Sequence, residues 1–289
     1  MENQYGRVKL AEKGARISII AYVLLSILKL AIGYFSNSEA LLADGLNNST
    51  DILSSLAVLI GLRISRKPAD ENHRYGHWKA ETLSSLIASF IMIAVGLNVL
   101  YNAVRSIIKF KEQSPDITSA VTGLICAAAI YFVYRYNKKI AVSINSSALM
   151  AAAKDNLSDA LVSIGTAVGI FASQFGLPWI DPAAAVIVGL IICKTGFDIF
   201  REATHNLTDG FDAKNLNSIT KAIIEVPGVM NIRDIKGRVY GNNIMVDIVA
   251  VVDASLSISE GHKITEDIEN HLKDKFGLID AVVHLEPSK

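Results

Sequence analysis

The sequence is poor in cysteine, in charged residues and in clustered basic residues, and each shortage excludes a class of protein. Two of its 289 residues are cysteine, Cys126 and Cys193, and both lie in apolar runs. This excludes a disulfide scaffold, a zinc knuckle and a redox pair of thiols. Charged residues amount to 19%, below the roughly one quarter of a soluble domain. No segment concentrates basic residues, so we expect no nucleic acid as a partner.

Long apolar runs are what the sequence has instead. Six of them fill the first 205 residues, and each is close to the ~20 residues with which a helix crosses a bilayer. They are residues 17–35, 41–62, 82–101, 117–134, 149–171 and 182–200. Lipid offers no hydrogen bonds to an open strand edge, so helices are expected. The sequence therefore predicts a six-helix transmembrane domain over residues 1–208.

The distribution of basic residues predicts how these helices are oriented. The segments before the first run, between the second and third and between the fourth and fifth carry 12 Lys and Arg, whereas the alternate loops carry 3. Basic loops stay in the cytoplasm. We therefore expect a multi-pass protein of the cell membrane, surrounded by lipid, with both termini cytoplasmic. Lys29 and Lys194 fall inside apolar runs, and we expect both to snorkel toward an interface.

Residues 209–289 differ in composition and predict a separate domain. They hold 13 acidic and 9 basic residues. The predicted elements are a helix over 215–225, strands over 232–239 and 244–251, a helix over 259–276 that Ser259 caps, and a strand over 281–285. The order α-β-β-α-β predicts a small α+β domain with both helices on one face of the sheet.

Carboxylates inside the apolar runs are the sharpest functional signal. Asn47 and Asp51 lie four residues apart in the second run, as do Asp155 and Asp159 in the fifth, so each pair shares one face of its helix. Ionised groups at membrane depth are costly and mark a pathway or a site. If the two helices pack together, the four side chains can converge on one cation. The alternative is that they are polar residues near the interface that meet only water.

Histidines outside the runs provide further candidate ligands. Asp70, His73 and His77 lie in the loop after the second run, where one oxygen and two imidazole nitrogens could chelate a transition metal. The alternative is a solvated charged loop. In the C-terminal region His284 and Glu286 lie two residues apart on a predicted strand, hence on one face. Isolated surface histidines are common, so their role as ligands stays open.

The segments around these residues resemble the cation diffusion facilitator family over nearly the whole chain. They are Ala43–Asp51, Pro68–Glu81, Asp155–Asp159, Trp179–Pro182, Leu207–Asp209 and Val283–Pro287. The resemblance implies a homodimer that exports divalent metal cations in exchange for protons, with six transmembrane helices and a cytoplasmic ferredoxin-like domain. It implies a transporter rather than an enzyme, with no cofactor besides the metal that is bound or transported.

The resemblance places the family's transport site on Asn47, Asp51, Asp155 and Asp159. Zinc members of the family typically have histidine at one or more of these positions, and this sequence has none. An all-oxygen set of ligands suits Mn²⁺ better than Zn²⁺, and it resembles the pattern of the family's manganese exporters. Mg²⁺, Ca²⁺ and Fe²⁺ also accept oxygen ligands, so efflux of Fe²⁺ or Zn²⁺ by the same mechanism stays an alternative.

The resemblance also implies two features on the cytoplasmic side of the membrane. Asp70, His73 and His77 match the family's second metal site completely. Lys79 and Asp209 match a charge pair that helps to hold the dimer together where the membrane domain meets the cytoplasmic domain.

The cytoplasmic binuclear site of the family is matched only in part. His262, His284 and Glu286 fall on its ligand positions. Two further positions, which hold histidine in well-known zinc members, carry Arg233 and Val249 here. Neither side chain can bind a cation, so we do not expect a full zinc-type site. The C-terminal domain then binds metal through other ligands or serves mainly to dimerise.

Two alternative functions, from other classes of protein, are also compatible with some features of this sequence. An intramembrane aspartyl protease needs two catalytic acids on facing helices, whereas an Asn and three Asp in two i, i+4 pairs favour ion coordination. The sequence also has no Gly-x-Gly-Asp segment, which is typical of that class. A membrane-tethered metal sensor would not need carboxylates in two separate spans. Export of a divalent cation is therefore the function we expect.

Overall fold

We describe the protein from a computed structural model. It describes residues 2–35, 39–108, 117–174, 180–276, 278 and 280–288. The chain divides into two compact units, Glu2–Ala203 and Thr204–Lys289, and each is described by itself.

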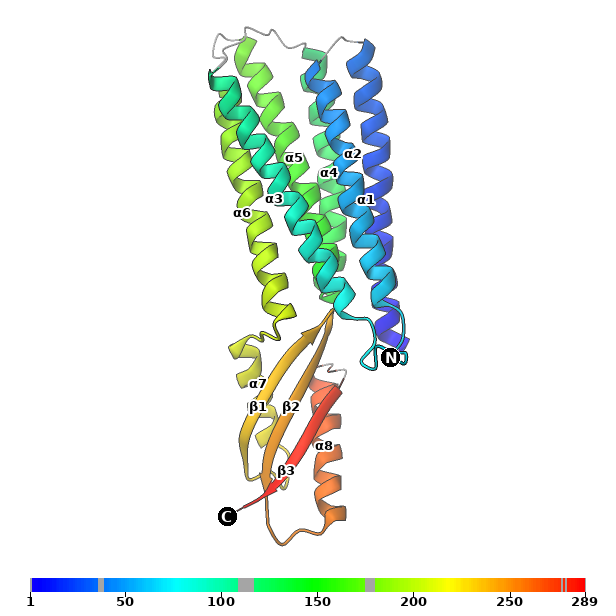
Figure 1. Cartoon of the computed structure of the whole chain (residues 1–289), viewed down its shortest axis with the longest axis vertical. Helices are drawn as coiled ribbons and strands as arrows, with labels where there is room; N and C mark the ends of the chain where they lie inside the picture. Colours follow the sequence, from blue (N-terminus) through cyan, green and yellow to red (C-terminus); the bar gives the residue numbers. More distant parts are fainter. Residues whose placement is uncertain are drawn as a thin grey trace. The chain divides into compact units, whose positions relative to one another are not determined.

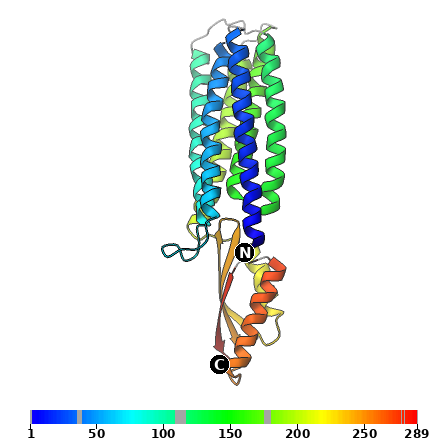
Figure 2. The same ribbon diagram turned by 90° about the vertical axis from the view of Figure 1, so that its right-hand side faces the viewer.

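Within the described ranges, six long helices build the first unit. They are α1 (Glu2–Phe35), α2 (Glu39–Ser65), α3 (Lys79–Ile108), α4 (Ile117–Ile144), α5 (Ser147–Gln174) and α6 (Ile180–Leu207). The helices run lengthwise beside one another in both views (Figures 1 and 2). The predicted helical bundle is thereby confirmed.

The first helix begins at Glu2, well before the apolar run that starts near residue 17. The basic segment that was predicted to precede the helix is therefore helical. Val8, Ala11 and Ala15 explain the difference, because they recur at spacings of three and four and are at most 1% exposed. This periodicity gives the segment a buried face against the bundle.

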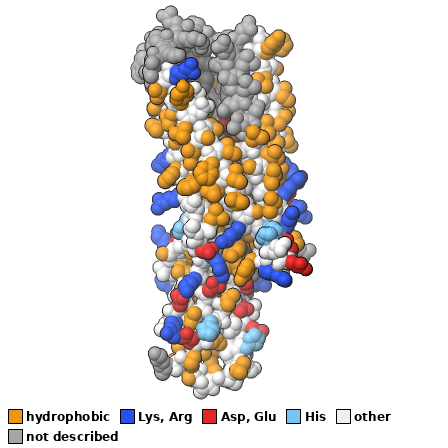
Figure 3. All heavy atoms as spheres, in the orientation of Figure 1, with side chains coloured by type: hydrophobic (Ala, Val, Ile, Leu, Met, Phe, Trp, Pro, Cys, Tyr) orange, Lys and Arg blue, Asp and Glu red, His pale blue; other side chains and the backbone are white. Residues whose placement is uncertain are grey.

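The bundle carries an apolar surface. Figure 3 shows hydrophobic side chains over much of its described middle, whereas acidic and basic side chains gather over the C-terminal unit. By length and composition, two segments of the described chain could cross a membrane, Gly6–Phe35 and Lys79–Arg105. The remaining four spans and the orientation stay predictions.

Small residues allow close approach between helices of the bundle. Ala152 of α5 is 1% exposed. A Cβ atom added to Gly61 of α2 would lie 2.2 Å from the Ser84 Cβ of α3, and one added to Gly96 of α3 would lie 2.7 Å from the Cys193 Sγ of α6. Larger residues would force these helices apart, as in other membrane bundles.

The second unit contains a three-stranded sheet and two helices in the predicted order. The elements are α7 (Ala213–Ile224), β1 (Asn231–Tyr240), β2 (Asn243–Val252), α8 (Ile258–Phe276) and β3 (Asp280–Pro287). The strand order is β1-β2-β3, with β1 antiparallel and β3 parallel to β2. The β1–β2 turn uses Gly241 at φ +63°, a conformation that glycine adopts without strain.

Both helices cover the same face of the sheet, as predicted (Figure 2). Ile248 and Ala250 of β2 are buried in one cluster with Ile223 of α7 and Ile268 of α8. Alternate residues of a strand point to the same face, so one row of β2 side chains supplies the centre of this core.

The cap of α8 differs from the prediction. Ser257, not Ser259, precedes the helix: its hydroxyl accepts the Glu260 N–H at 3.3 Å, and its own N–H donates to the Glu260 carboxylate at 2.8 Å. This is a capping box, which requires a Glu three residues after the cap. The residue three after Ser259 is His262, which cannot close the same box.

Candidate metal sites

Three carboxylates from α2 and α5 meet inside the bundle. Asp51 of α2 and Asp155 and Asp159 of α5 are 2%, 7% and 9% exposed. One carboxylate oxygen from each lies within 4.8 Å of the other two. The i, i+4 spacing puts both α5 residues on the face that meets α2. Asn47, the fourth predicted ligand, lies on α2 one turn before Asp51, and its side chain is outside those that the structure describes.

This cluster can hold a divalent cation through oxygen alone. Three carboxylates that face one another in a buried place repel unless protons neutralise them or a positive charge lies between them. A divalent cation would supply that charge and would take one oxygen from each residue. Carboxylate oxygens suit hard cations such as Mn²⁺, Mg²⁺ and Ca²⁺. The arrangement therefore supports cation binding inside the helical bundle.

Tyr22 of α1 belongs to the surroundings of this cluster, and sequence reasoning missed it. Its side chain is fully buried, and its phenol O–H donates a hydrogen bond to Oδ2 of Asp159. A signal was present in the sequence. Ser18, Tyr22 and Ser26 recur every four residues in an otherwise apolar run, so they form a polar stripe on one helix face.

Lys29, one turn further along this stripe, does not snorkel as predicted. Its side chain is 2% exposed, and its Nζ donates to the Asn48 Oδ1 of α2 at 3.5 Å. The Asn48 amide oxygen on the neighbouring helix accepts this hydrogen bond and holds the amino group inside the bundle. The sequence of α1 alone does not reveal this contact. Lys194 of α6 is exposed.

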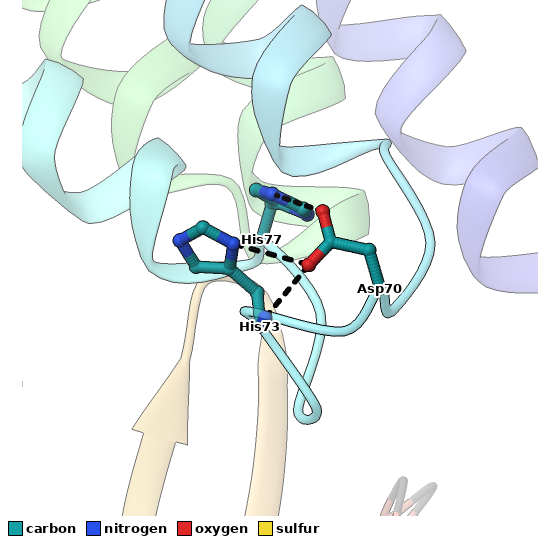
Figure 4. Close-up of side chains that lie close together, drawn as sticks. All are labelled: Asp70, His73 and His77. Carbon is teal, nitrogen blue, oxygen red and sulfur yellow. Dashed lines mark hydrogen bonds and ion pairs between the residues drawn. The ribbon is translucent and has the colours of Figure 1, made fainter.

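A second possible metal site lies in the loop before α3 (Figure 4). Asp70 and His73 are exposed and His77 is half-buried, and the three offer ligand atoms within 4.8 Å of one another. Both imidazole rings turn toward the Asp70 carboxylate (Figure 4). The His73 Nδ1 lies 3.3 Å from Asp70 Oδ1, and the His77 Nε2 lies 3.4 Å from Asp70 Oδ2.

Hydrogen bonds orient the Asp70 and His77 side chains of this loop cluster. The backbone N–H of His73 donates to the Asp70 carboxylate at 2.7 Å and lowers the pKa of Asp70, with a smaller effect from the Asn72 N–H. The His77 Nδ1 lies 3.3 Å from the Pro68 carbonyl oxygen. With the hydrogen on Nδ1, which the Pro68 carbonyl oxygen can accept, Nε2 is the ring atom that a metal would bind, and it lies beside the Asp70 carboxylate.

The loop leads directly into a buried link with α5. Glu81, in the first turn of α3, is fully buried and accepts a hydrogen bond from the Ser146 hydroxyl. That hydroxyl also accepts the Leu149 N–H at the start of α5, at 3.2 Å. The positive N-terminal end of a helix favours a carboxylate, so Glu81 anchors α5, the helix that carries Asp155 and Asp159, to α3.

The predicted ligands of the C-terminal domain do not form a cluster of three within the described residues. His262 and Glu286 line one pocket of about 380 Å³, but His284 does not. Arg233 of β1 forms an ion pair with Glu286. The register places Val249 beside His284. A guanidinium group thus neutralises one predicted ligand, and an apolar side chain adjoins another.

The predicted charge pair is not tested by the structure. Lys79 begins α3 in the first unit. Asp209 follows α6 in the second unit, at φ +58°. The pairing of Lys79 with Asp209 therefore stays a prediction.

Comparisons with known proteins match both units to cation efflux proteins. The profile of the cation efflux transmembrane domain matches residues 15–208, and that of the cytoplasmic domain of cation efflux proteins matches residues 211–288. The manganese efflux system protein MneS of Bacillus subtilis (strain 168) is 52% identical over 284 residues, which cover 98% of each chain. The manganese efflux system protein MneP of the same organism is 30% identical over 290 residues, 97% of each chain.

Several solved structures of MamM C-terminal domains match about a quarter of the chain. One is a MamM C-terminal domain, which is 22% identical at a TM-score of 0.27 and covers 27% of this chain and 100% of that one.

Proposed function

The chain belongs to the cation efflux, or cation diffusion facilitator, family, and on this premise we propose that it exports Mn²⁺ from the cytoplasm in exchange for protons. Members of this family are membrane transporters of metal cations and not enzymes. Family membership therefore sets aside an intramembrane protease and a membrane-tethered sensor.

The buried carboxylate cluster is the observation that supports Mn²⁺ as the exported ion. Asp51, Asp155 and Asp159 offer oxygen only, and Asn47 would add a neutral amide oxygen. Zn²⁺ favours imidazole and thiolate ligands in a tetrahedral shell, whereas a hard cation prefers carboxylate, carbonyl and water. The printed names of MneS and MneP concern manganese efflux and agree with this choice. Zn²⁺ or Fe²⁺ is the alternative cargo.

Exchange with protons follows from competition for the same oxygen atoms. In the state that opens to the cytoplasm, Mn²⁺ displaces protons from the three carboxylates. A rearrangement of the helices then exposes the site on the outside, where protons compete with the cation and release it. The inward proton gradient drives the return, as is expected for a site near the bilayer midplane in a secondary transporter.

The remaining predicted residues have supporting roles in this proposal. Asp70, His73 and His77 bind a metal outside the transport pathway, on the cytoplasmic side. Both termini are cytoplasmic, and six helices span the membrane. The chain works as a homodimer, in which Lys79 and Asp209 form the junctional charge pair. His262 and His284 are secondary candidates for metal binding, because Arg233 already pairs with Glu286.

A flux assay tests the proposal. The purified protein is reconstituted into vesicles with an imposed pH gradient, and transport of Mn²⁺ and Zn²⁺ is compared. We expect Mn²⁺ transport that speeds up with the proton gradient and collapses when an ionophore removes it. Transport of Zn²⁺ in preference to Mn²⁺ would contradict the choice of ion, and flux that is indifferent to the gradient would contradict proton exchange.

A further inference from the structure

Apolar side chains pack around the ring of Tyr22, and its hydroxyl lies at the carboxylate cluster. The ring of Tyr22 packs in a buried cluster with Leu25, Cys126 and Ile130. These neighbours account for the burial of the ring but offer no carboxylate or amide to the oxygen. A buried O–H group needs a hydrogen-bond partner, and in the described part of the bundle Asp159 is the partner of this one.

The position of α1 relative to α5 is held by a second contact one turn away. The Asn156 Nδ2 of α5 donates to the Ser18 Oγ of α1 at 3.0 Å, and the Asn137 Nδ2 of α4 donates to the same oxygen at 2.7 Å. All three side chains are fully buried. Ser18 therefore anchors α1 at the turn before Tyr22, and the phenol meets Asp159 from a fixed backbone.

The hydrogen bond orients the Asp159 carboxylate. Oδ2 accepts the phenol O–H, and one carboxylate oxygen of Asp159 lies within 4.8 Å of a carboxylate oxygen of Asp51 and of Asp155. Hydrogen-bond partners of metal ligands fix the orientation of the ligand and raise metal affinity.

We infer that Tyr22 is a positioning residue of the transport site, which holds the Asp159 carboxylate in the orientation in which it binds the exported divalent cation. The inference rests on the proposed function of the cluster.

Tyr22→Phe tests the inference, since it removes one oxygen atom and leaves the ring that fills the apolar cluster. Tyr34→Phe is the matched control, because Tyr34 lies on the same helix and is 73% exposed. Mn²⁺ flux is measured in vesicles that contain the full-length protein. We expect the KM for Mn²⁺ to rise about 10- to 100-fold in Tyr22→Phe, with the maximal rate retained. Tyr34→Phe should behave as wild type.

Two results would overturn the inference. One is an unchanged KM for Mn²⁺ in Tyr22→Phe. The other is a lower maximal rate with an unchanged KM, which a merely structural role predicts. Asp159→Ala in the same assay separates failure of this inference from failure of the proposed function. Wild-type flux in Asp159→Ala would refute the assignment of the transport site. If Tyr22→Phe does not fold, Tyr22→Leu, which also lacks the hydroxyl, carries the same KM measurement.

Discussion

Carboxylates of the helical bundle and of the C-terminal domain have opposite surroundings. In the bundle, three aspartates of α2 and α5 are buried and face one another. In the C-terminal domain, Glu286 pairs with Arg233, and Asp247 pairs with Arg238 at 2.9 Å. Arginine side chains thus supply the counter-charge of Glu286 and Asp247, whereas the three buried aspartates of the bundle lie together as like charges. Gathering of like charges, rather than the number of acids, distinguishes the buried cluster from a solvated surface.

The largest expected effect is removal of one buried carboxylate. Asp51→Ala or Asp159→Ala should abolish Mn²⁺ transport and leave the protein folded, because two carboxylates cannot replace the lost oxygen and charge at membrane depth. Vesicle flux measures the effect, and Asp267→Ala, an exposed acid of α8, is the control. Wild-type flux in either purified variant would refute the assignment of the site.

A change of ligand type in the bundle should alter selectivity. Asn47→His should favour Zn²⁺, because an imidazole nitrogen is a softer ligand than an amide oxygen. A tenfold rise in the Zn²⁺/Mn²⁺ flux ratio corresponds to about 1.4 kcal/mol of relative affinity. Competitive flux of both ions through the same vesicles measures it. An unchanged ratio would show that Asn47 is not a selectivity ligand.

The exposed loop cluster should be less important for export than the buried one. His73→Ala combined with His77→Ala should remove metal binding at the loop and reduce flux without abolishing it, because these residues lie outside the proposed pathway. Calorimetric titration and flux are compared in the same preparation, with His271→Ala as the control for loss of a histidine. Complete loss of flux in a folded, dimeric double variant would contradict the auxiliary role.

The smallest expected effect concerns the counter-charge in the C-terminal domain. Arg233→Ala should free Glu286 and allow weak additional metal binding near His262, since both side chains line the same pocket. The matched control is Arg238→Ala, which frees Asp247 away from that pocket. Equal metal binding by both variants and by wild type would show that Arg233 does not suppress a site there.

Local patterns predicted much of the fold. The i, i+4 pairs, the apolar runs and the hairpin at Gly241 are properties of one helix or one turn, so the sequence indicates them directly. The start of α1 was misplaced because Val8, Ala11 and Ala15 are too few apolar residues to extend a run, although their spacing marks a helix face.

Tertiary neighbours account for what could not be predicted. Tyr22 in an apolar run is typical of a core residue, and only the approach of α1 to α5 brings its hydroxyl to Asp159. In the same way, Asn48 on α2 decides that Lys29 stays inside the bundle. Polar residues at helical spacing on an apolar helix indicate which face of α1 is polar, but not which residues of α2 and α5 meet it.

Electron paramagnetic resonance of bound Mn²⁺ tests the central claim most directly, because nitrogen ligands couple to the metal electron spin. The sample is the purified full-length His73→Ala, His77→Ala double variant, compared with the same protein carrying Asp155→Ala. The account predicts a bound Mn²⁺ signal without imidazole nitrogen coupling, which disappears when Asp155 is replaced. A signal with imidazole coupling that disappears with Asp155→Ala, or a signal that Asp155→Ala leaves intact, would contradict an all-oxygen site at Asp51, Asp155 and Asp159.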